Sequence, residues 1–230
     1  MTSCLLRLTF HAAQILKQQS ARALVGLALL CLSQHARAAE PAFSVPEPVQ
    51  MLGYNGHIME PFLSRDGSLL FFNNRNGPKD QTDLHVARRI NDLSFRYLGP
   101  LQGANSAKLD GVASLDRNGN FYFVSTRDYD DTGNTLWGAH FAGGAVQDVG
   151  ALKTNFTPKK LFRLNMDMEI SADGQTLYVV ANRWDLLRGM PATSDIIMAR
   201  KTEAGFERLP NASALMATIN TKHLEYERSS

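Results

Sequence analysis

The sequence has no cysteine beyond residue 31, no marked excess of either charge, and no apolar run long enough to cross a membrane. Because Cys4 and Cys31 both lie near the N-terminus, the rest of the chain can form neither a disulfide nor a thiolate metal site. The 24 basic and 22 acidic residues nearly cancel, which argues against a nucleic-acid partner. Helical periodicity is weak beyond residue 40, so an all-β chain is expected.

The N-terminal segment has the features of a Sec-type signal peptide. Lys17 and Arg22 precede the apolar run 23–32, and Ala36-Arg37-Ala38 supplies a small-x-small cleavage motif. That run is about half of the roughly 20 residues that a membrane span requires. We therefore predict a cleaved signal over residues 1–38, a short linker over 39–44, and a periplasmic or secreted protein. The lack of disulfides favours a bacterial source.

Three turn signals recur along the remaining sequence. Asp66-Gly67, Asn118-Gly119 and Asp173-Gly174 are 52 and 55 residues apart. An Asp-Gly or Asn-Gly pair between apolar runs is a strong hairpin signal, and it predicts a type I′ turn with positive φ at both central residues.

The segments around these turns repeat as well. Each turn precedes an apolar, β-branched or aromatic run, at 68–72, 120–124 and 176–180. An arginine follows each run, then a strand that starts at residue 83, 135 or 195, and then an outer segment at 95–98, 146–149 or 206–209. Four short strands in about 50–55 residues are typical of a β-propeller blade. A plain antiparallel sandwich is the alternative, but it does not require matched residue types at matched positions.

The sequence therefore predicts an all-β fold of propeller blades over residues 45–230. We expect three complete four-stranded units, at about 54–101, 102–155 and 156–212, and the start of a fourth at 213–230. Because propellers need about four to eight blades to close, an incomplete ring is expected. The segment 45–53 is similar to the outer strand near residues 95–99, which predicts that it completes the last blade of a ring.

The turn motifs carry a resemblance to a known family. Ser64-Arg65-Asp66-Gly67 and Ser171-Ala172-Asp173-Gly174 resemble the S-x-D-G signature of TolB-like (WD40-like) β-propeller repeats. The resemblance covers residues 45–230 and implies a truncated member of that family. In the middle unit, Asp116, Asn118 and Thr135 replace the expected serine and two aspartates. The family includes periplasmic scaffolds and peptidase-associated propellers, so the resemblance implies a fold but no particular activity.

The recurring polar positions allow a structural and a functional interpretation. The arginines at 75, 127 and 183 either form a ring of anion-binding guanidiniums or pair within each blade, for instance Arg75 with Asp83 and Arg183 with Asp195. Their repetition in every unit favours structural pairs. The repeat positions to which we assign structural roles are Asp66, Gly67, Arg75, Asp83, Asn118, Gly119, Arg127, Asp173, Gly174, Arg183 and Asp195.

Acidic residues recur before the first strand of each unit, in a region that can approach the central opening of a propeller. These candidate channel-facing binding residues are Glu60, Asp110, Asp167, Glu169 and Glu225. They can bind a cation or a basic or sugar ligand, or they can serve only as caps and turn acceptors. No metal-binding or nucleophile motif accompanies them, so we expect no metal, no cofactor and no catalytic residue.

These patterns favour an exported, non-enzymatic scaffold that binds a protein or a small ligand. A propeller hydrolase acting on glycans or peptides is the alternative, and it requires two carboxylates about 5–10 Å apart without structural partners. A non-functional fragment of a longer propeller is the third interpretation. We expect no nucleic-acid partner and no membrane span, and we expect open blade edges to permit self-association.

Overall fold

The computed structural model of this chain describes residues 45–74, 81–157, 163–185, 187 and 190–225. The predicted signal peptide, the predicted linker and Arg75 lie outside these residues. All of the strands belong to one unit of the chain, which begins at Glu47.

The described strands form three sheets, which we call blades 1, 2 and 3. Blade 1 contains β2 (Met59–Leu63), β3 (Leu69–Asn73), β4 (Leu84–Asn91) and β5 (Ser94–Pro100). Blade 2 contains β6 (Asp110–Leu115), β7 (Asn120–Ser125), β8 (Leu136–Ala142) and β9 (Ala145–Ala151). Blade 3 contains β10 (Arg163–Ile170), β11 (Thr176–Asp185), β12 (Met190–Thr202) and β13 (Gly205–Arg208). Each blade is an antiparallel meander in sequence order, which confirms the all-β prediction of three four-stranded propeller blades.

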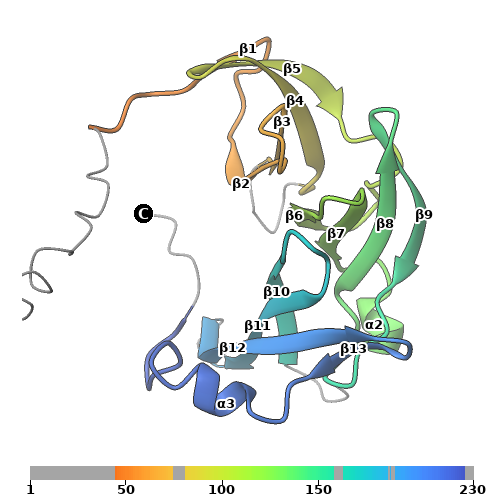
Figure 1. Cartoon of the computed structure of the whole chain (residues 1–230), viewed down its shortest axis with the longest axis vertical. Helices are drawn as coiled ribbons and strands as arrows, with labels where there is room; N and C mark the ends of the chain where they lie inside the picture. Colours follow the sequence, from red (N-terminus) through yellow and green to blue (C-terminus); the bar gives the residue numbers. More distant parts are fainter. Residues whose placement is uncertain (1–44, 75–80, 158–162, 186, 188–189, 226–230) are drawn as a thin grey trace, which may run out of the picture. The chain divides into compact units, whose positions relative to one another are not determined.

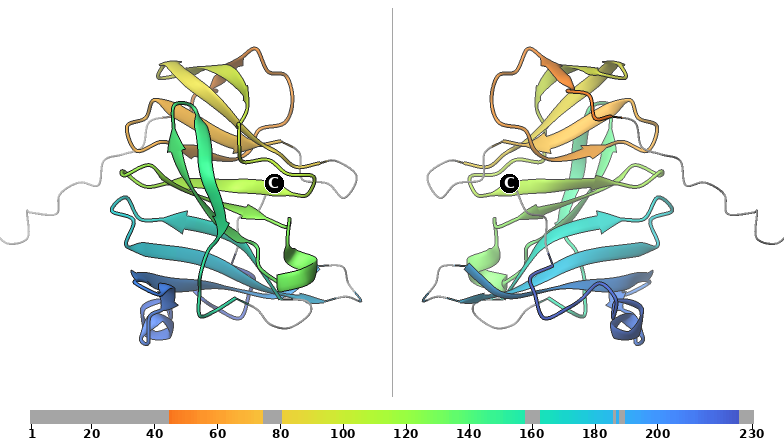
Figure 2. Two further views of the ribbon diagram at one scale, coloured as in Figure 1. Left: turned by 90° about the vertical axis from the view of Figure 1, so that its right-hand side faces the viewer. Right: turned by 90° about the vertical axis from the view of Figure 1, so that its left-hand side faces the viewer.

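The blades follow one another along an arc, with the first strand of each on the inner side and the fourth on the outer side (Figure 1). The side views show them stacked face to face (Figure 2). Phe71 of blade 1 packs with Phe121 and Phe123 of blade 2 in one apolar cluster. Leu136 of blade 2 packs with blade 3 in a second cluster. The middle strands are therefore buried on both faces, as their continuous apolar runs require.

The first hairpin turn of each blade differs from the predicted type. Among the described residues preceding these glycines, neither Asp66 nor Asn118 has positive φ, whereas Gly67 has φ +71° and Gly119 φ +82°. In blade 1 the Gly67 amide donates to the Ser64 carbonyl over 2.7 Å, which centres the turn on residues 65 and 66. The glycine then occupies the left-handed position that follows a type I turn. The prediction of a type I′ turn is wrong, because an Asp-Gly pair suits either geometry.

The turn of blade 2 uses one carboxylate where blade 1 uses two side chains. In blade 1, Ser64 Oγ accepts from the Leu69 amide over 2.9 Å and donates to Asp66 over 2.6 Å. In blade 2, Asp116 itself accepts from the Asn118 and Asn120 amides over 2.8 and 2.9 Å. Asp116 therefore replaces the serine without loss of the turn, because its carboxylate accepts hydrogen bonds directly from the amides of the turn.

The N-terminal strand β1 (Gln50–Leu52) does not take the predicted place. It pairs in parallel with β5, on the outer edge of blade 1. Tyr54 comes two residues after β1 in the sequence. The centre of its ring lies 5.3 Å from that of Phe72 and 4.8 Å from that of Tyr97. The segment thus covers the face of blade 1 that points away from blade 2, as the capping unit of a repeat array does.

The described helices are the single turns α2 (Tyr129–Thr132) and α3 (Ala212–Leu215). Within the described residues, no helix is both long enough and apolar enough to traverse a bilayer.

Candidate functional site

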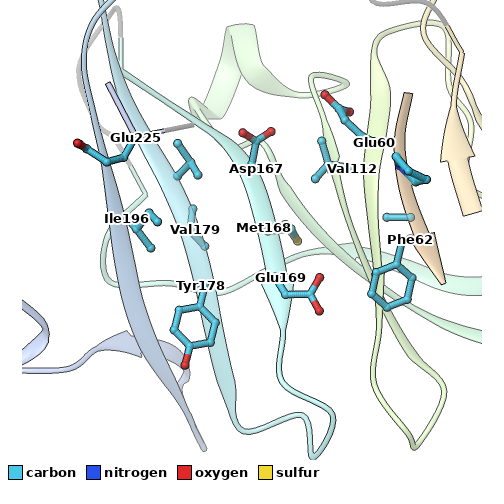
Figure 3. A pocket seen from close by; sticks show the side chains of 13 residues that line it. Glu60, Phe62, Val112, Asp167, Met168, Glu169, Tyr178, Val179, Ile196 and Glu225 are labelled. Atoms are coloured by element: carbon cyan, nitrogen blue, oxygen red, sulfur yellow. The ribbon is translucent and has the colours of Figure 1, made fainter. Parts of the chain in front are cut away.

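The inner strands of the three blades line one pocket of about 460 Å³. Its lining comes from β2, β6, β10, β11 and β12, and from Glu225. The apolar lining includes Phe62, Val112, Met168, Val179 and Ile196 (Figure 3). A pocket of this size accommodates a small molecule or a few side chains of a partner.

Four of the five predicted channel-facing acids line this inner-strand pocket. They are Glu60, Asp167, Glu169 and Glu225. Figure 3 shows the carboxylates of Glu60, Asp167 and Glu225 toward one end of the pocket and Glu169 toward the other. The structure therefore brings together acids that are up to 165 positions apart in the sequence.

A β-bulge in each inner strand turns these side chains toward the pocket. The pairing register shifts by one residue between Met59 and Phe62 in β2, and between Gly111 and Ser114 in β6. A similar shift occurs in β10 just before Asp167. Bulges re-aim side chains and are enriched next to functional sites.

Two of the bulges also place non-glycine residues in left-handed backbone. Glu60 has φ +49° and Val112 has φ +53°. For the β-branched Val112 this conformation is a genuine outlier, and such strain concentrates at functional sites. Glu60 and Val112 both line the pocket, so the strained backbone and the cavity coincide.

Glu169 is held by partners from two other blades. Its Oε1 atom accepts from Arg65 Nη2 over 2.6 Å, and its Oε2 atom accepts from Ser114 Oγ over 3.0 Å. Both oxygens thus have structural partners, although the side chain is 48% exposed.

Arg65 links all three blades from its place in the first turn. Its Nε atom donates to the Leu115 carbonyl of blade 2 over 3.1 Å, and its Nη2 atom donates to Glu169 and to the Ile170 carbonyl of blade 3. The guanidinium also lies 5.1 Å from the centre of the Phe62 ring. Arg65 gave no signal in the sequence because it occupies the variable position of the S-x-D-G motif.

Asp110 does not face the channel, and this prediction needs correction. Its side chain is fully buried. It accepts from Arg127 Nη2 over 2.6 Å at Oδ1, and from Ser106 Oγ over 2.8 Å at Oδ2. The reason is its position before the β6 bulge, so that Val112 occupies the pocket-facing position instead.

Glu225 begins its segment in the way that Asp110 begins β6. Asn105, five residues before Asp110, makes paired bonds of 2.7 and 2.9 Å to the backbone of Leu84. Asn220, five residues before Glu225, makes paired bonds of 2.8 and 2.9 Å to the backbone of Ile196. The backbone amide of Asp110 then donates to the Thr82 carbonyl, two residues before β4, and that of Glu225 donates to the Ser194 carbonyl in β12.

The two acids differ at their second oxygen. Thr221 Oγ1 donates to Oε1 of Glu225 over 2.5 Å, as Ser106 does to Asp110. The other oxygen of Asp110 is bonded to Arg127, whereas Oε2 of Glu225 is buried and has no hydrogen-bond partner among the described residues. Glu225 therefore retains capacity for one further donor.

Three residues of β11 and β12 that line the pocket are partly exposed, whereas the matching residues of β7 and β8 in blade 2 are buried. In blade 2, Tyr122, Val124 and Leu136 are buried against blade 3. Strand pairing places Tyr178, Val180 and Ile196 at the same positions of blade 3, where they are half-buried and line the pocket. We call these three residues the open face.

Of the remaining predicted acids, Glu60 and Asp167 both take part in polar interactions, so neither is free. In the part of the chain that the structure describes, no group of three or more His, Cys, Asp or Glu side chains could hold a metal ion. Among the described acids of the inner-strand pocket, Glu225 thus has a buried oxygen that can accept a further hydrogen bond, beside an apolar surface.

The predicted arginine pairs have different outcomes. Arg127 does pair structurally, but with Asp110 rather than with the third strand, where Thr135 instead donates to the Asn165 carbonyl. No ion pair joins Arg183 to Asp195 in the described segments, although strand register makes them diagonal neighbours, with Arg183 opposite Thr193 and Asp195 opposite Ala181. Asp83 accepts a 3.3 Å bond from Gln81, and its predicted partner Arg75 lies outside the described residues.

Comparison with known proteins gives only distant structural similarities. No family model matches the chain, and no curated protein matches it. TolB from Acinetobacter baumannii aligns with 68% of this chain at 14% identity and a TM-score of 0.43, and the chain spans 33% of its length. A glycoside hydrolase aligns with 72% of the chain at 12% identity and a TM-score of 0.44, over 59% of its own length. A puromycin-hydrolysing peptidase of Mycobacterium tuberculosis aligns with 76% of the chain at 17% identity and a TM-score of 0.40, over 25% of its own length. Similarities this distant carry no information about activity, ligand or partner.

Proposed function

We propose that this protein is an exported, non-enzymatic scaffold that binds a protein partner through the inner-strand pocket and the adjoining open face. The partner surface would combine apolar side chains with at least one arginine or lysine. The single observation that carries this proposal is the match between the open face and the interface of blade 2 with blade 3.

The apolar part of the proposal rests on continuity with that interface. Tyr122, Val124 and Leu136 of blade 2 are buried by the next blade, at positions that Tyr178, Val180 and Ile196 occupy in blade 3. A surface that matches an internal interface, yet remains half exposed, is suited to receive another protein surface.

The charge of the pocket defines the partner further. The acids gathered there, together with the orphaned Oε2 of Glu225, favour a cationic group over an acidic one. In blade 2 the corresponding oxygen is satisfied by a guanidinium. The same acids oppose the pairing of two open faces from two copies of this chain, because like charges would meet.

The alternative hydrolase needs two carboxylates without structural partners. Glu169 has both oxygens bonded, and Glu60 and Asp167 are engaged as well, which supports the scaffold over the hydrolase. Export itself rests on the N-terminal sequence pattern alone.

The test is a titration of residues 39–230 with two blocked peptides. The basic peptide is Arg-Ile-Thr-Leu-Lys-Val, and the control peptide has glutamate in place of arginine and lysine. By isothermal titration calorimetry, we expect the basic peptide to bind at least about tenfold more tightly, which corresponds to about 1.4 kcal/mol. Glu225→Gln should remove most of that preference, while Glu203→Gln, a change on the hairpin between β12 and β13, should leave it intact.

Equal affinity for the two peptides, or an unchanged preference in the Glu225→Gln protein, would refute the proposal. Turnover of casein or of aryl glycosides by the same preparation would favour the hydrolase. Self-association remains a separate prediction. Sedimentation velocity over a range of protein concentrations tests it. A dimer that Ile196→Asp abolishes would contradict the expectation that the acids keep two open faces apart.

A further inference from the structure

A second pocket, of about 670 Å³, lies at the end of blade 3 where β10 and β12 begin and β11 ends. It is distinct from the inner-strand pocket, with which it shares no lining residue. Three arginines line it, Arg163, Arg183 and Arg208, together with one carboxylate, that of Asp195. We call it the arginine pocket.

The arginine pocket occupies the place of the buried ion pair of blade 2. Asp110 pairs with Ser125 across β6 and β7, and Asn165 pairs with Ala181 across β10 and β11, at matching positions of the two blades. Arg127 and Arg183 are likewise equivalent, each two residues beyond that pair. Blade 3 therefore keeps the arginine but has an amide where blade 2 has the carboxylate.

The aromatic partners of the arginine are also replaced. Arg127 lies 5.2 Å from the centre of the Phe123 ring and 4.9 Å from that of Trp137. The equivalent residues of blade 3 are Val179 and Ile197, which offer no π face. Arg183 has thus lost both the carboxylate and the two rings that hold Arg127.

The asparagine that replaces the carboxylate is left unsatisfied. Asn165 is 1% exposed and lines the pocket, and neither its Oδ1 nor its Nδ2 atom has a hydrogen-bond partner in the described structure. The Oδ1 atom of Asn182, another lining residue, is also buried without a partner. Buried polar groups of native proteins are nearly always paired, so these atoms point to a polar ligand.

The arginines are also arranged against one another. Arg163 and Arg183 are direct partners in the register of β10 and β11. Like charges directly opposite each other destabilise a strand pair, and among the described lining residues Asp195 is the single countercharge for three guanidiniums. An anion between the arginines would relieve this repulsion through charge-assisted hydrogen bonds.

We propose that the arginine pocket binds a small hydroxylated ligand that carries an oxyanion, such as a sugar acid. The guanidiniums hold the oxyanion, and the buried amide of Asn165 exchanges hydrogen bonds with a neighbouring hydroxyl group. This site is independent of the protein-binding function proposed above.

The test uses D-glucuronate, D-glucose and inorganic phosphate as probes in calorimetric titrations of residues 39–230. We expect glucuronate to bind, glucose to show no binding, and phosphate to compete with glucuronate because both present an oxyanion. The affinity should fall as the salt concentration rises.

The decisive variant is Asn165→Asp, which rebuilds the carboxylate of blade 2 next to Arg183. It should reduce the affinity for glucuronate at least tenfold without lowering the thermal midpoint, since the new carboxylate takes the place of the ligand. Asp195→Asn should strengthen binding, because it removes the competing acid. Arg208→Gln, a change of an exposed side chain, should weaken binding and leave the fold intact.

Failure of both glucuronate and phosphate to bind the unmodified protein would overturn the proposal. So would equal binding of glucose, or an affinity for glucuronate that Asn165→Asp and Arg208→Gln leave unchanged. The peptide titration reports on Glu225 and the open face, so its failure would not affect this result.

Discussion

Blades 2 and 3 share their strand register but differ in how their buried polar position is satisfied. In blade 2, Asp110 and Arg127 neutralise each other inside the protein. In blade 3, Asn165 and Arg183 occupy the same positions and make no such pair. The change from carboxylate to amide, together with the loss of the two aromatic rings, separates a closed structural site from the site for which we propose an external anion.

The same two blades differ in what covers them. The side chains of Tyr122, Val124 and Leu136 are core, and their counterparts in blade 3 are surface. The repeat sequence therefore sets which side chains lie on the face of a blade. Whether that face is buried depends on whether another blade or a partner packs against it. The following four changes test this comparison, from the largest expected effect to the smallest.

Removing the buried carboxylate of blade 2 should have the largest effect. Asp110→Asn should lower the free energy of unfolding by about 3–5 kcal/mol, because it leaves Arg127 buried without its countercharge. Urea unfolding monitored by tryptophan fluorescence measures the loss. The matched change in blade 3, Asn165→Asp, should cause no loss, and comparable destabilisation by both changes would contradict the comparison.

Truncating matched apolar residues should separate core from surface. Leu136→Ala should cost about 2–5 kcal/mol, since Leu136 is fully buried between blades 2 and 3. Ile196→Ala, at the matching position of the open face, should cost about 1 kcal/mol, because this side chain is only partly buried. Similar losses for the two variants would mean that the open face is covered in solution.

Arg65 should contribute stability that its counterpart in blade 2 does not. Arg65→Met should cost about 1–2 kcal/mol through loss of the bonds to Leu115 and Glu169, discounted for its 29% exposed side chain. The control is Arg117→Met, at the same place in the blade 2 turn, where the side chain is exposed. Chemical denaturation of the two variants side by side gives the difference, and equal midpoints would remove the proposed link between blades.

The smallest effect concerns the pH dependence of the turns. Hydrogen bonds from Ser64 and Ser68 lower the pKa of Asp66 to about 2. Because the folded-state pKa lies below the unfolded value, this contribution is complete above about pH 4 and is lost as the pH falls toward 2. Asp66→Asn should therefore make the midpoint of urea unfolding less dependent on pH between pH 4 and pH 2. An identical pH profile for the variant and the parent would exclude this contribution.

Much of the fold was predictable because each blade repeats the same turn and strand residues. The type of turn was not, since Asp66-Gly67 fits two geometries that differ only in backbone angles. The position of β1 was also not predictable, because an outer-strand pattern does not specify whether the strand pairs in parallel or closes a ring.

The candidate sites were predictable only in part. Glu60, Asp167 and Glu169 line one pocket because first strands lie on the inner side of the arc. Asp110 is the exception, since a bulge in β6 changes which residue faces the pocket. For the arginine pocket, the sequence singled out Arg183 but favoured a structural pair for it. Asn165 gave no signal, because it becomes informative only when it is compared with Asp110 at the same place in another blade.

The contacts of Arg65 have a consequence for how the array unfolds. In a simple linear repeat protein each unit interacts only with its immediate neighbours, and the ends fray one unit at a time. Arg65 adds a direct contact between blades 1 and 3, through Glu169 and the Ile170 carbonyl. This contact between blades that are not neighbours in the sequence penalises states in which blade 1 or blade 3 opens alone. The three blades should therefore exchange their amide hydrogens as one cooperative unit rather than as a graded series.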